Sequence, residues 1–259
     1  MLHLTLSSPV HNVGHDPFMS TPSPSMDRPD ASIARDRGHA PLWESVLQNV
    51  RTIGGAVLLA LIIRIILFEP FEIEGPSMEP SFLNGDKVLV SKFLFGLFLP
   101  FREEADLNWG SPSPGDVVVL RSPADGVDII KRVIGVAGDL IEVRAGRVYR
   151  NGVALPATDV GPCATGTGAM QEGCRVYASK VGEHAFHFST AHITEDPVPT
   201  RVPDGYFYVL GDHRDHSNDS RNPAVGAVRV TRIKGKALNI YWSRGENGLR
   251  FDRMLKRVQ

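Results

Sequence analysis

One long apolar segment constrains this chain more than any other feature of its sequence. The segment runs from Ile53 to Phe68 and carries a single charged residue, Arg64. A helix that crosses a membrane needs roughly 17 to 25 mostly apolar residues, and residues 43–50 extend the apolar helical face upstream. We therefore expect a single transmembrane helix over residues 43–68, with a helix buried in a globular core as the alternative. A cleaved signal peptide is rejected because the run begins about fifty residues into the chain.

The sequence before the apolar segment differs from the rest. Residues 1–40 are rich in Pro, Ser, Asp and His and lack apolar periodicity, which is typical of a disordered tail. Arg35, Arg37 and Arg51 precede the segment, whereas only Lys87 follows within about twenty residues. The positive-inside rule thus predicts a cytoplasmic N-terminal tail. The bulk of the chain would then lie on the extracytoplasmic (periplasmic) side.

The cysteine count bears on the same question. Cys163 and Cys174 are the only two cysteines, and they lie in a stretch rich in Gly and Thr that is typical of a loop. In an oxidising compartment they would form one disulfide that closes a short loop; in a reducing one they would be two free thiols. A metal site is disfavoured because no second ligand pair lies nearby.

After the apolar segment the pattern is mainly β. Two dipeptides, Ala145-Gly146 and Asn151-Gly152, are typical of tight hairpins. We expect a membrane-anchored catalytic β-sheet core from residues 69–144 and 205–259, with residues 145–204 as an inserted, smaller subdomain. The expected strands are Lys87–Val90, Asp116–Leu120, Ile129–Val136, Leu140–Arg144, Arg147–Tyr149, Tyr206–Leu210 and Ala237–Trp242.

The charge balance excludes one class of partner. The 259 residues carry a formal net charge of −1, and no basic stripe is evident along the sequence. Nucleic-acid binding depends largely on such positive charge, so we expect no nucleic-acid partner.

Four segments are patterned strongly enough to indicate chemistry. They are 77–81 (Ser-Met-Glu-Pro-Ser), 114–120 (Pro-Gly-Asp-Val-Val-Val-Leu), 129–139 (Ile-Ile-Lys-Arg-Val-Ile-Gly-Val-Ala-Gly-Asp) and 211–221 (Gly-Asp-His-Arg-Asp-His-Ser-Asn-Asp-Ser-Arg). In this order, behind an apolar helix, they closely resemble the motifs of type I signal peptidases, bacterial leader peptidases that use a Ser–Lys dyad. The resemblance implies that Ser77 is the nucleophile and Lys131 the general base.

The chemistry of these two residues fits that assignment. A serine hydroxyl needs a base to attack an amide, and Lys131 can supply one only if its pKa falls roughly 2 to 3 units below about 10.4. In a strand Lys131 shares a face with Ile129 and Val133, whose burial would lower that pKa. Arg132 would point the other way, and we expect it to be an ordinary solvated charge.

The resemblance also assigns supporting roles. Ser217 corresponds to the serine that orients the lysine by a hydrogen bond, and Asp219 and Arg221 to a structural ion pair near the site. Gly75 stands where many members have a Ser or Thr that binds the oxyanion, which leaves the backbone N–H of Ser77 and a second donor that the sequence does not identify.

Two groups of histidines raise the question of a metal. His213 stands where the family usually has Asn, and together with His216, Asp212 and Asp215 it superficially resembles a metal site. The motif match argues against this, and we expect no metal and no cofactor. Three further histidines lie in the tail without fixed geometry, and we do not expect them to bind metal: His3, His11 and His15.

Residues 82–101 are rich in large apolar side chains. We expect part of them to pack in the core and part to form a surface that dips into the lipid bilayer. The residues concerned are Phe82, Phe93, Leu94, Phe95, Leu97, Phe98, Leu99 and Phe101.

The resemblance thus implies a membrane-bound, monomeric serine endopeptidase of the bacterial inner (plasma) membrane that removes signal peptides from exported preproteins through an acyl-enzyme. The resemblance implies substrates with small residues before the cut, bound as an added strand. Two alternatives are a self-cleaving Ser–Lys protease and a catalytically inactive, membrane-anchored β-module that binds export substrates.

Overall fold

A computed structural model describes residues 42–97, 102, 104, 105, 107–163, 172–191 and 196–258. The predicted tail over residues 1–40 lies outside these residues. The chain divides into two compact units, Met1–Val50 and Arg51–Gln259, and the second holds all of the strands described below.

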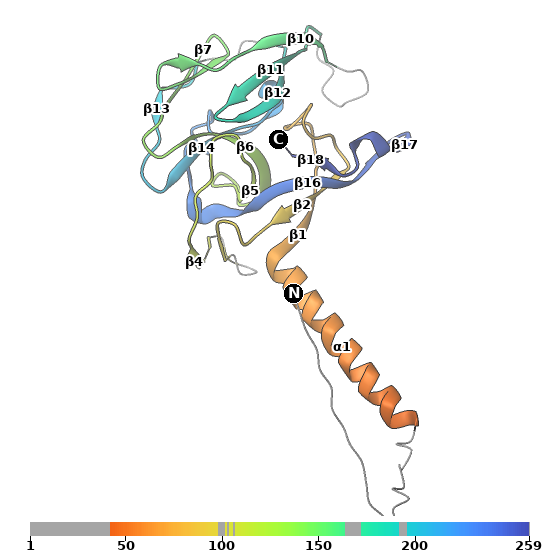
Figure 1. The fold of residues 1–259 in the computed structure, drawn as a ribbon. Helices are drawn as coiled ribbons and strands as arrows, with labels where there is room; N and C mark the ends of the chain where they lie inside the picture. Colours follow the sequence, from red (N-terminus) through yellow and green to blue (C-terminus); the bar gives the residue numbers. More distant parts are fainter. Residues whose placement is uncertain are drawn as a thin grey trace, which may run out of the picture. The chain divides into compact units, whose positions relative to one another are not determined.

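The long helix α1 covers Leu42–Leu67, close to the predicted helix over 43–68 (Figure 1). It has no internal proline, and it ends just before Glu69-Pro70, since the residue before a proline is disfavoured in helical conformation. No helix within the described ranges is long and apolar enough to cross a membrane. The predicted helix is confirmed, whereas its role as a membrane span stays a prediction.

The largest sheet is antiparallel throughout and has the strand order β1-β2-β16-β5-β6-β14-β15, with β17 and β18 paired to β16. Every strand predicted for this region is present. The bounds are β1 Phe68–Glu72, β2 Asp86–Ser91, β5 Val117–Arg121, β6 Asp128–Val136, β14 Tyr206–Leu210, β15 Val228–Arg229, β16 Ile233–Gly245, β17 Gly248–Leu249 and β18 Lys256–Arg257.

Strand β5 explains how this sheet is buried. Its continuous run of Val and Leu is typical of a strand covered on both faces. Val117 and Val119 pack in one apolar cluster with Met78 and Phe82, whereas Val118 and Leu120 pack in a second cluster on the other side. The middle of the sheet, including the neighbouring strand β6, is therefore shielded from water on both faces.

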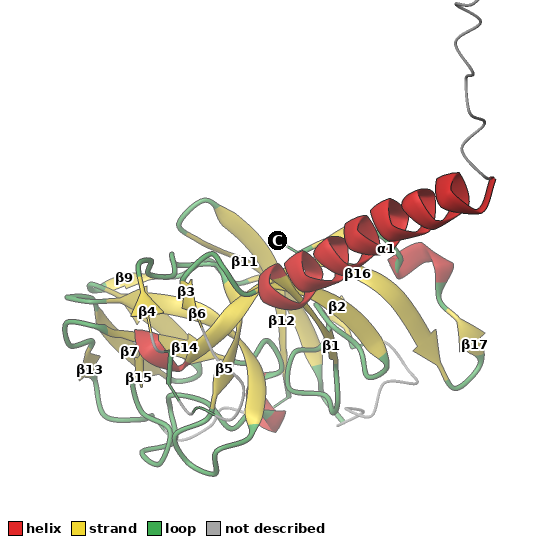
Figure 2. Ribbon diagram, turned by 90° about the horizontal axis from the view of Figure 1, so that it is seen from below, coloured by secondary structure: helices red, strands yellow, loops and turns green. Residues whose placement is uncertain are grey.

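Three smaller sheets complete the β structure. Their orders are β13-β7-β8-β9, β10-β11-β12 and β3-β4. The bounds are β3 Gly96–Leu97, β4 Leu107–Asn108, β7 Leu140–Arg144, β8 Arg147–Arg150, β9 Val153–Ala154, β10 Thr158–Pro162, β11 Arg175–Val181, β12 His184–Thr190 and β13 Thr200–Arg201. Beyond α1, the described residues form only short 3-10 turns, Arg214–His216 (η1), Val230–Arg232 (η2) and Phe251–Arg253 (η3), drawn in red in Figure 2.

The two predicted hairpin turns are confirmed. Ala145 and Gly146 have φ values of 47° and 76°, and Asn151 and Gly152 have values of 54° and 79°. Such left-handed conformations are what Asn-Gly-type turns require. They connect β7 to β8 and β8 to β9, which pair as antiparallel neighbours.

Residues 145–204 hold more regular structure than the sequence indicated. The hairpin β11–β12 pairs over seven residues, from Arg175↔Thr190 to Val181↔His184. Its Phe186 and Phe188 share an apolar cluster with Ile134 of β6. That residues 145–204 form an inserted subdomain of their own stays a prediction.

Cys163 and Cys174 are joined by a disulfide. It links the end of β10 to the start of β11, so it closes the loop between two strands that already pair. Of the two states left open by the sequence, the bonded one is present.

Candidate active site

Ser77 lies in the loop between β1 and β2. Two residues that follow Ser77 anchor this loop in the core, because Met78 is fully buried and Phe82 is almost fully buried. Turn hydrogen bonds run from Glu79 N–H to the Pro76 carbonyl and from Phe82 N–H to the Met78 carbonyl. The Ser77 side chain is half-buried and is held at a defined position by its own backbone.

Lys131 reaches Ser77 from β6. Its Nζ lies 2.8 Å from Ser77 Oγ and 2.8 Å from the carbonyl oxygen of Ile130. The side chain is only 3% exposed, and in the sheet it lies opposite Val118 of β5. The two residues that the sequence singled out, 54 positions apart, are therefore in hydrogen-bond contact.

Burial sets the protonation behaviour of this lysine. Loss of water lowers the pKa of the Lys131 ammonium from its ordinary 10.5 to about 8, while the negative charges of Asp219 and Asp212 oppose that shift. A neutral amine is thus accessible near pH 8, which a base for a serine hydroxyl requires.

Arg132 corrects the sequence analysis. It was predicted to be a solvated charge, but it is only 1% exposed. Its Nε and Nη2 donate to the two carboxylate oxygens of Asp212 at 2.9 and 2.8 Å, and its Nη1 donates to the Gly115 carbonyl. Its guanidinium also lies 4.4 Å from the ring centre of Phe186. The prediction assumed a wet second face of β6, whereas that face is covered.

The loop after β14 supplies the other charged groups. Arg221 donates to both carboxylate oxygens of Asp219 at 2.8 and 2.9 Å, and Asp219 also accepts the backbone N–H of Gly211. Arg221 donates in addition to the carbonyl of Arg214 at 2.6 Å. The Asp219–Arg221 ion pair is therefore present. It holds the start of this loop, at Gly211, against its end, at Asp219 and Arg221.

Ser217 lies close to both Gly211 and the Ser77 backbone. A Cβ added to Gly211 would lie 2.2 Å from Ser217 Oγ and 2.5 Å from the Ser77 carbonyl oxygen, so the three residues converge. Ser217 Oγ is buried without a hydrogen-bond partner among the described residues. Its role as the group that orients Lys131 stays a prediction. Gly211 was overlooked in the sequence, although a glycine before an Asp-rich loop signals a close approach.

The surroundings of Gly75 bear on the oxyanion. Gly75 has a φ of 79°, and its N–H donates to Asn84 Oδ1 at 3.2 Å. An added Cβ there would meet no atom within 4 Å. The N–H of Ser77, in contrast, has no hydrogen-bond acceptor in the part of the chain that the structure describes.

The two histidines next to the site lie close together with their rings tilted. His213 and His216 have ring centres 4.6 Å apart, and the buried imidazole of His213 has no hydrogen-bond partner among the described residues. Burial, and then His216, lower the pKa of His213 to about 4. Asp212 is engaged by Arg132, and Asp215 accepts from Thr190 and Ala191. His3, His11 and His15 lie outside the described residues.

The apolar residues of the 82–101 segment divide as expected where they are described. Phe82 and Phe95 are buried, whereas Phe93 and Leu94 are about half exposed. Four others lie outside the described side chains: Leu97, Phe98, Leu99 and Phe101.

Residues 46–242 match the family model described as signal peptidase, peptidase S26. The chain therefore belongs to the signal peptidase family S26 and is an enzyme that hydrolyses peptide bonds.

Individual relatives agree with that class. Signal peptidase I of Pseudomonas fluorescens is 31% identical over 85% of this chain and 79% of its own length. Signal peptidase I S of Bacillus subtilis is 31% identical over 77% of this chain and 90% of its own length. A solved structure of signal peptidase I from Enterococcus faecalis is 25% identical in sequence to this chain. The match covers 49% of this chain and 97% of the other, with a TM-score of 0.29.

Proposed function

We propose that this chain is a signal peptidase I that removes N-terminal signal peptides from exported preproteins through a Ser77 acyl-enzyme with Lys131 as general base. The observation that carries the proposal is the 2.8 Å contact between a buried Lys131 Nζ and Ser77 Oγ. Burial lowers the pKa of this lysine, and a serine hydroxyl next to a neutral amine is an activated nucleophile.

In the first half-reaction Ser77 Oγ attacks the scissile carbonyl while Lys131 Nζ takes its proton. The tetrahedral intermediate collapses when the resulting ammonium gives a proton to the leaving amine, the new N-terminus of the mature protein. The signal peptide is left as an ester on Ser77. In the second half-reaction Lys131 takes a proton from water as the oxygen of that water attacks the ester. The resulting ammonium returns the proton to Ser77 Oγ as the ester bond breaks, which releases the peptide and restores the enzyme.

The oxyanion needs donors on the side of Ser77. The Ser77 N–H is the first, because it has no other acceptor in the described structure. Gly75 is engaged through Asn84 and has no side chain to contribute. The second donor thus comes from a group that substrate binding brings into place.

The edges of the main sheet favour binding of the substrate as a strand. Among the described strands β1 pairs only with β2. Residues 128–131 of β6 pair with β5 but not with β14, whose described pairing covers Arg132–Val136. These unpaired backbone groups lie in the elements that flank Ser77 and Lys131. An extended chain added there would present its small residues beside the dyad.

We further propose that the enzyme is membrane-bound, with its N-terminus in the cytoplasm and the β unit outside. Helix α1 and the charge bias around it support this placement, and so does the disulfide, which persists in an oxidising compartment. A cluster of exposed apolar residues on and around β3–β4 fits contact with lipid: Phe93, Leu94, Leu107 and Trp109.

Cleavage of a preprotein by the detergent-solubilised enzyme tests the proposal. We expect Ser77→Ala and Lys131→Ala each to reduce the rate by at least about a thousandfold. Equal rates in wild type and both variants would refute the dyad. No cleavage by folded wild type would favour the inactive β-module instead.

A further inference from the structure

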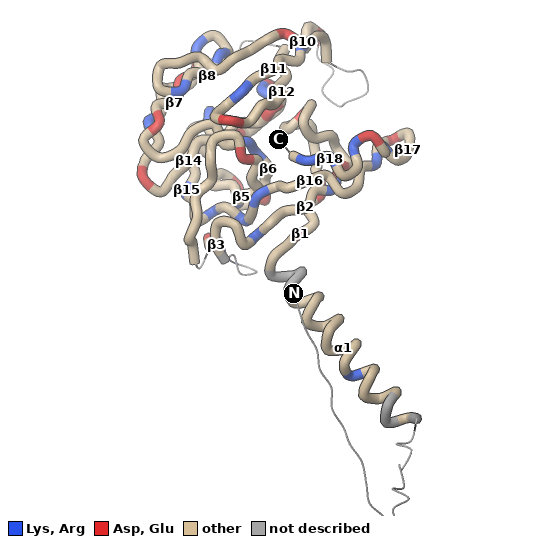
Figure 3. The backbone as a smooth tube through the Cα atoms, in the orientation of Figure 1, with Lys and Arg blue, Asp and Glu red and all other residues tan. Residues whose placement is uncertain are grey.

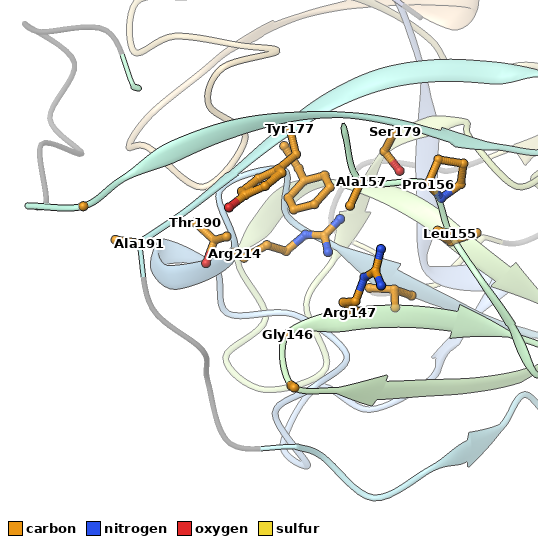
Figure 4. A pocket seen from close by; sticks show the side chains of 14 residues that line it. Gly146, Arg147, Leu155, Pro156, Ala157, Tyr177, Ser179, Thr190, Ala191 and Arg214 are labelled. Atoms are coloured by element: carbon orange, nitrogen blue, oxygen red, sulfur yellow. The ribbon is translucent and has the colours of Figure 1, made fainter. Parts of the chain in front are cut away.

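A cavity that is lined by neither Ser77 nor Lys131 carries positive charge that the peptidase chemistry does not use. It has a volume of about 320 Å³ and lies between the hairpin β11–β12, the hairpin β7–β8 and the turn η1. Among its described lining residues two are arginines, Arg147 and Arg214, and none is acidic. Figure 4 shows both guanidinium groups directed into the cavity.

Arg214 is held in place by groups that do not neutralise it. Its side chain is 6% exposed, its Nε donates to the Gly211 carbonyl at 3.1 Å, and its guanidinium lies 4.3 Å from the ring centre of Phe188. Phe188 is stacked in turn on Tyr177, with ring centres 5.3 Å apart. The guanidinium is therefore fixed in orientation, so little conformational entropy is lost when it binds a ligand.

The carboxylates nearest the cavity accept hydrogen bonds from other groups and do not pair with its two arginines. Within the described residues no ion pair joins a carboxylate to Arg147 or Arg214. Asp196 accepts the N–H of Ala145 at 2.7 Å, and Asp215 accepts from the Thr190 hydroxyl and the Ala191 N–H at the cavity rim.

The pKa of Arg214 is that of a buried cation without a carboxylate bonded to it among the described residues. Burial, followed by repulsion from Arg221, lowers the pKa of Arg214 to about 10, although Asp212 and Asp219 oppose the shift. A buried cation in this state is stabilised by any anion that enters the cavity.

We propose that this cavity is a binding site for a phosphate group, held between the guanidinium groups of Arg147 and Arg214 with the hydroxyl groups of Tyr177 and Ser179 as further donors. Two arginine forks and two hydroxyls offer donors in several directions, which suits a tetrahedral oxyanion better than a planar carboxylate. The phosphate belongs either to a soluble phosphomonoester or to a lipid headgroup. The site is independent of the proposed peptidase activity, because no step of that reaction involves it.

Calorimetric titration of the full-length protein in nonionic detergent with inorganic phosphate, at constant ionic strength, tests this proposal. We expect saturable binding with a Kd of roughly millimolar order, and at least about tenfold weaker binding in Arg147→Gln, which loses a charge-assisted hydrogen bond. Arg147 is exposed, so the variant should fold. Tyr177→Phe keeps the aromatic stack and should weaken binding several-fold.

The matched control is Lys180→Gln. Lys180 is an exposed residue of β11 that does not line the cavity, unlike its neighbour Ser179, and its replacement removes the same charge. It should leave phosphate binding unchanged. Absence of saturable binding by wild type, or equal weakening by Lys180→Gln, would overturn the proposal.

Two competitors distinguish the sources of the phosphate. Displacement of inorganic phosphate by glycerol phosphate, and not by micelles of phosphatidic acid, would assign a soluble ligand. Displacement by phosphatidic acid, and not by diacylglycerol or glycerol phosphate, would assign a lipid headgroup.

Discussion

Lys131 combines two properties that ordinarily exclude one another, since it is an ionisable amine and it lies in the dry middle of a sheet. At 3% exposure it loses nearly all contact with water, and its two hydrogen bonds go to Ser77 and to the Ile130 carbonyl. The residue is suited to catalysis because its surroundings disfavour its charged form. Because the same surroundings disfavour the ammonium form, Lys131 lowers the stability of the fold at neutral pH.

The substitution Lys131→Met should therefore stabilise the fold while abolishing cleavage. A pKa lowered from 10.5 to about 8 corresponds to a penalty of up to about 3 kcal/mol at pH 7. Because the folded pKa lies below the unfolded one, the penalty is complete below about pH 8 and disappears as the pH rises through 10.5. Thermal unfolding at pH 7 and at pH 11 measures the gain and its loss.

Lys180→Met on the exposed side of β11 is the control and should change the unfolding temperature little. A lower unfolding temperature for Lys131→Met than for wild type at pH 7 would contradict this account of the lysine.

The neighbouring residue shows where inference from sequence fails. Alternation along a strand correctly assigned Lys131 to an inward position, but it assigned Arg132 to water. That step requires one wet face, and β6 has none at this point, because Phe186 and Asp212 cover Arg132. Partners 54 and 80 positions away along the chain are not visible in a local pattern.

At the scale of elements, the Arg132–Asp212 pair joins β6 to the loop that follows β14. Both side chains are 1% exposed and their contact is bidentate. Removing one member of a buried pair leaves the other charge without compensation, which typically costs about 3–5 kcal/mol. The pair thus fixes the position of the loop that carries Ser217.

A double-mutant cycle measures this connection. We expect Asp212→Leu alone to lower the free energy of unfolding by about 3 kcal/mol, and Arg132→Met combined with Asp212→Leu to cost less than the sum of the two single changes. Urea unfolding of the four proteins gives the coupling energy. Additive effects would show that the two charges do not stabilise one another.

The close approach of the same loop to the nucleophile depends on Gly211. Because a Cβ there would lie 2.5 Å from the Ser77 carbonyl oxygen, Gly211→Ala must displace the Ser77 loop or Ser217. We expect kcat to fall by about a hundredfold with a modest loss of stability, since small misplacements of reacting groups cost this much. Gly55→Ala in α1, where an added Cβ meets nothing within 4 Å, is the control. Unchanged turnover in Gly211→Ala would disprove the close approach.

The elements themselves were largely predictable. Runs of β-branched residues bounded by turn signals located β2 and β6, which carry or flank the dyad, but not β1, which precedes Ser77; Ala145-Gly146 and Asn151-Gly152 located two turns. The hairpin β11–β12 was missed, although Phe186 and Phe188 alternate along β12 and Gly182 supplies a turn with a φ of 57°. Its polar and histidine-rich outer positions masked the pattern.

At the scale of the whole molecule, charge and covalent structure point to the environment of the β unit. Lys and Arg are intermixed with Asp and Glu over the β strands and their loops (Figure 3), in keeping with the net charge of −1. Such a surface favours solubility without a strong field for polyanions. Disulfides such as that between Cys163 and Cys174 form and persist mainly in oxidising compartments, in keeping with the extracytoplasmic position proposed for the β unit.

Reduction of this disulfide should destabilise the β unit without abolishing cleavage. A closed loop of this length contributes about 3 kcal/mol by restricting the unfolded chain. Neither cysteine hydrogen-bonds with Ser77 or Lys131, so the dyad should stay intact. Thermal unfolding with and without reductant, beside the Cys163→Ser/Cys174→Ser variant, measures the difference. An unfolding temperature insensitive to reductant in wild type would contradict this expectation.

The most direct test of the whole account is the pH dependence of kcat/KM for preprotein cleavage. The base must be neutral, and burial lowers the pKa of Lys131 to about 8. The rate should therefore rise about tenfold per pH unit below that value and level off above it. A rate that is flat between pH 6 and 9, or one that levels off near pH 6 as a histidine would dictate, would contradict the assignment of Lys131 as the base.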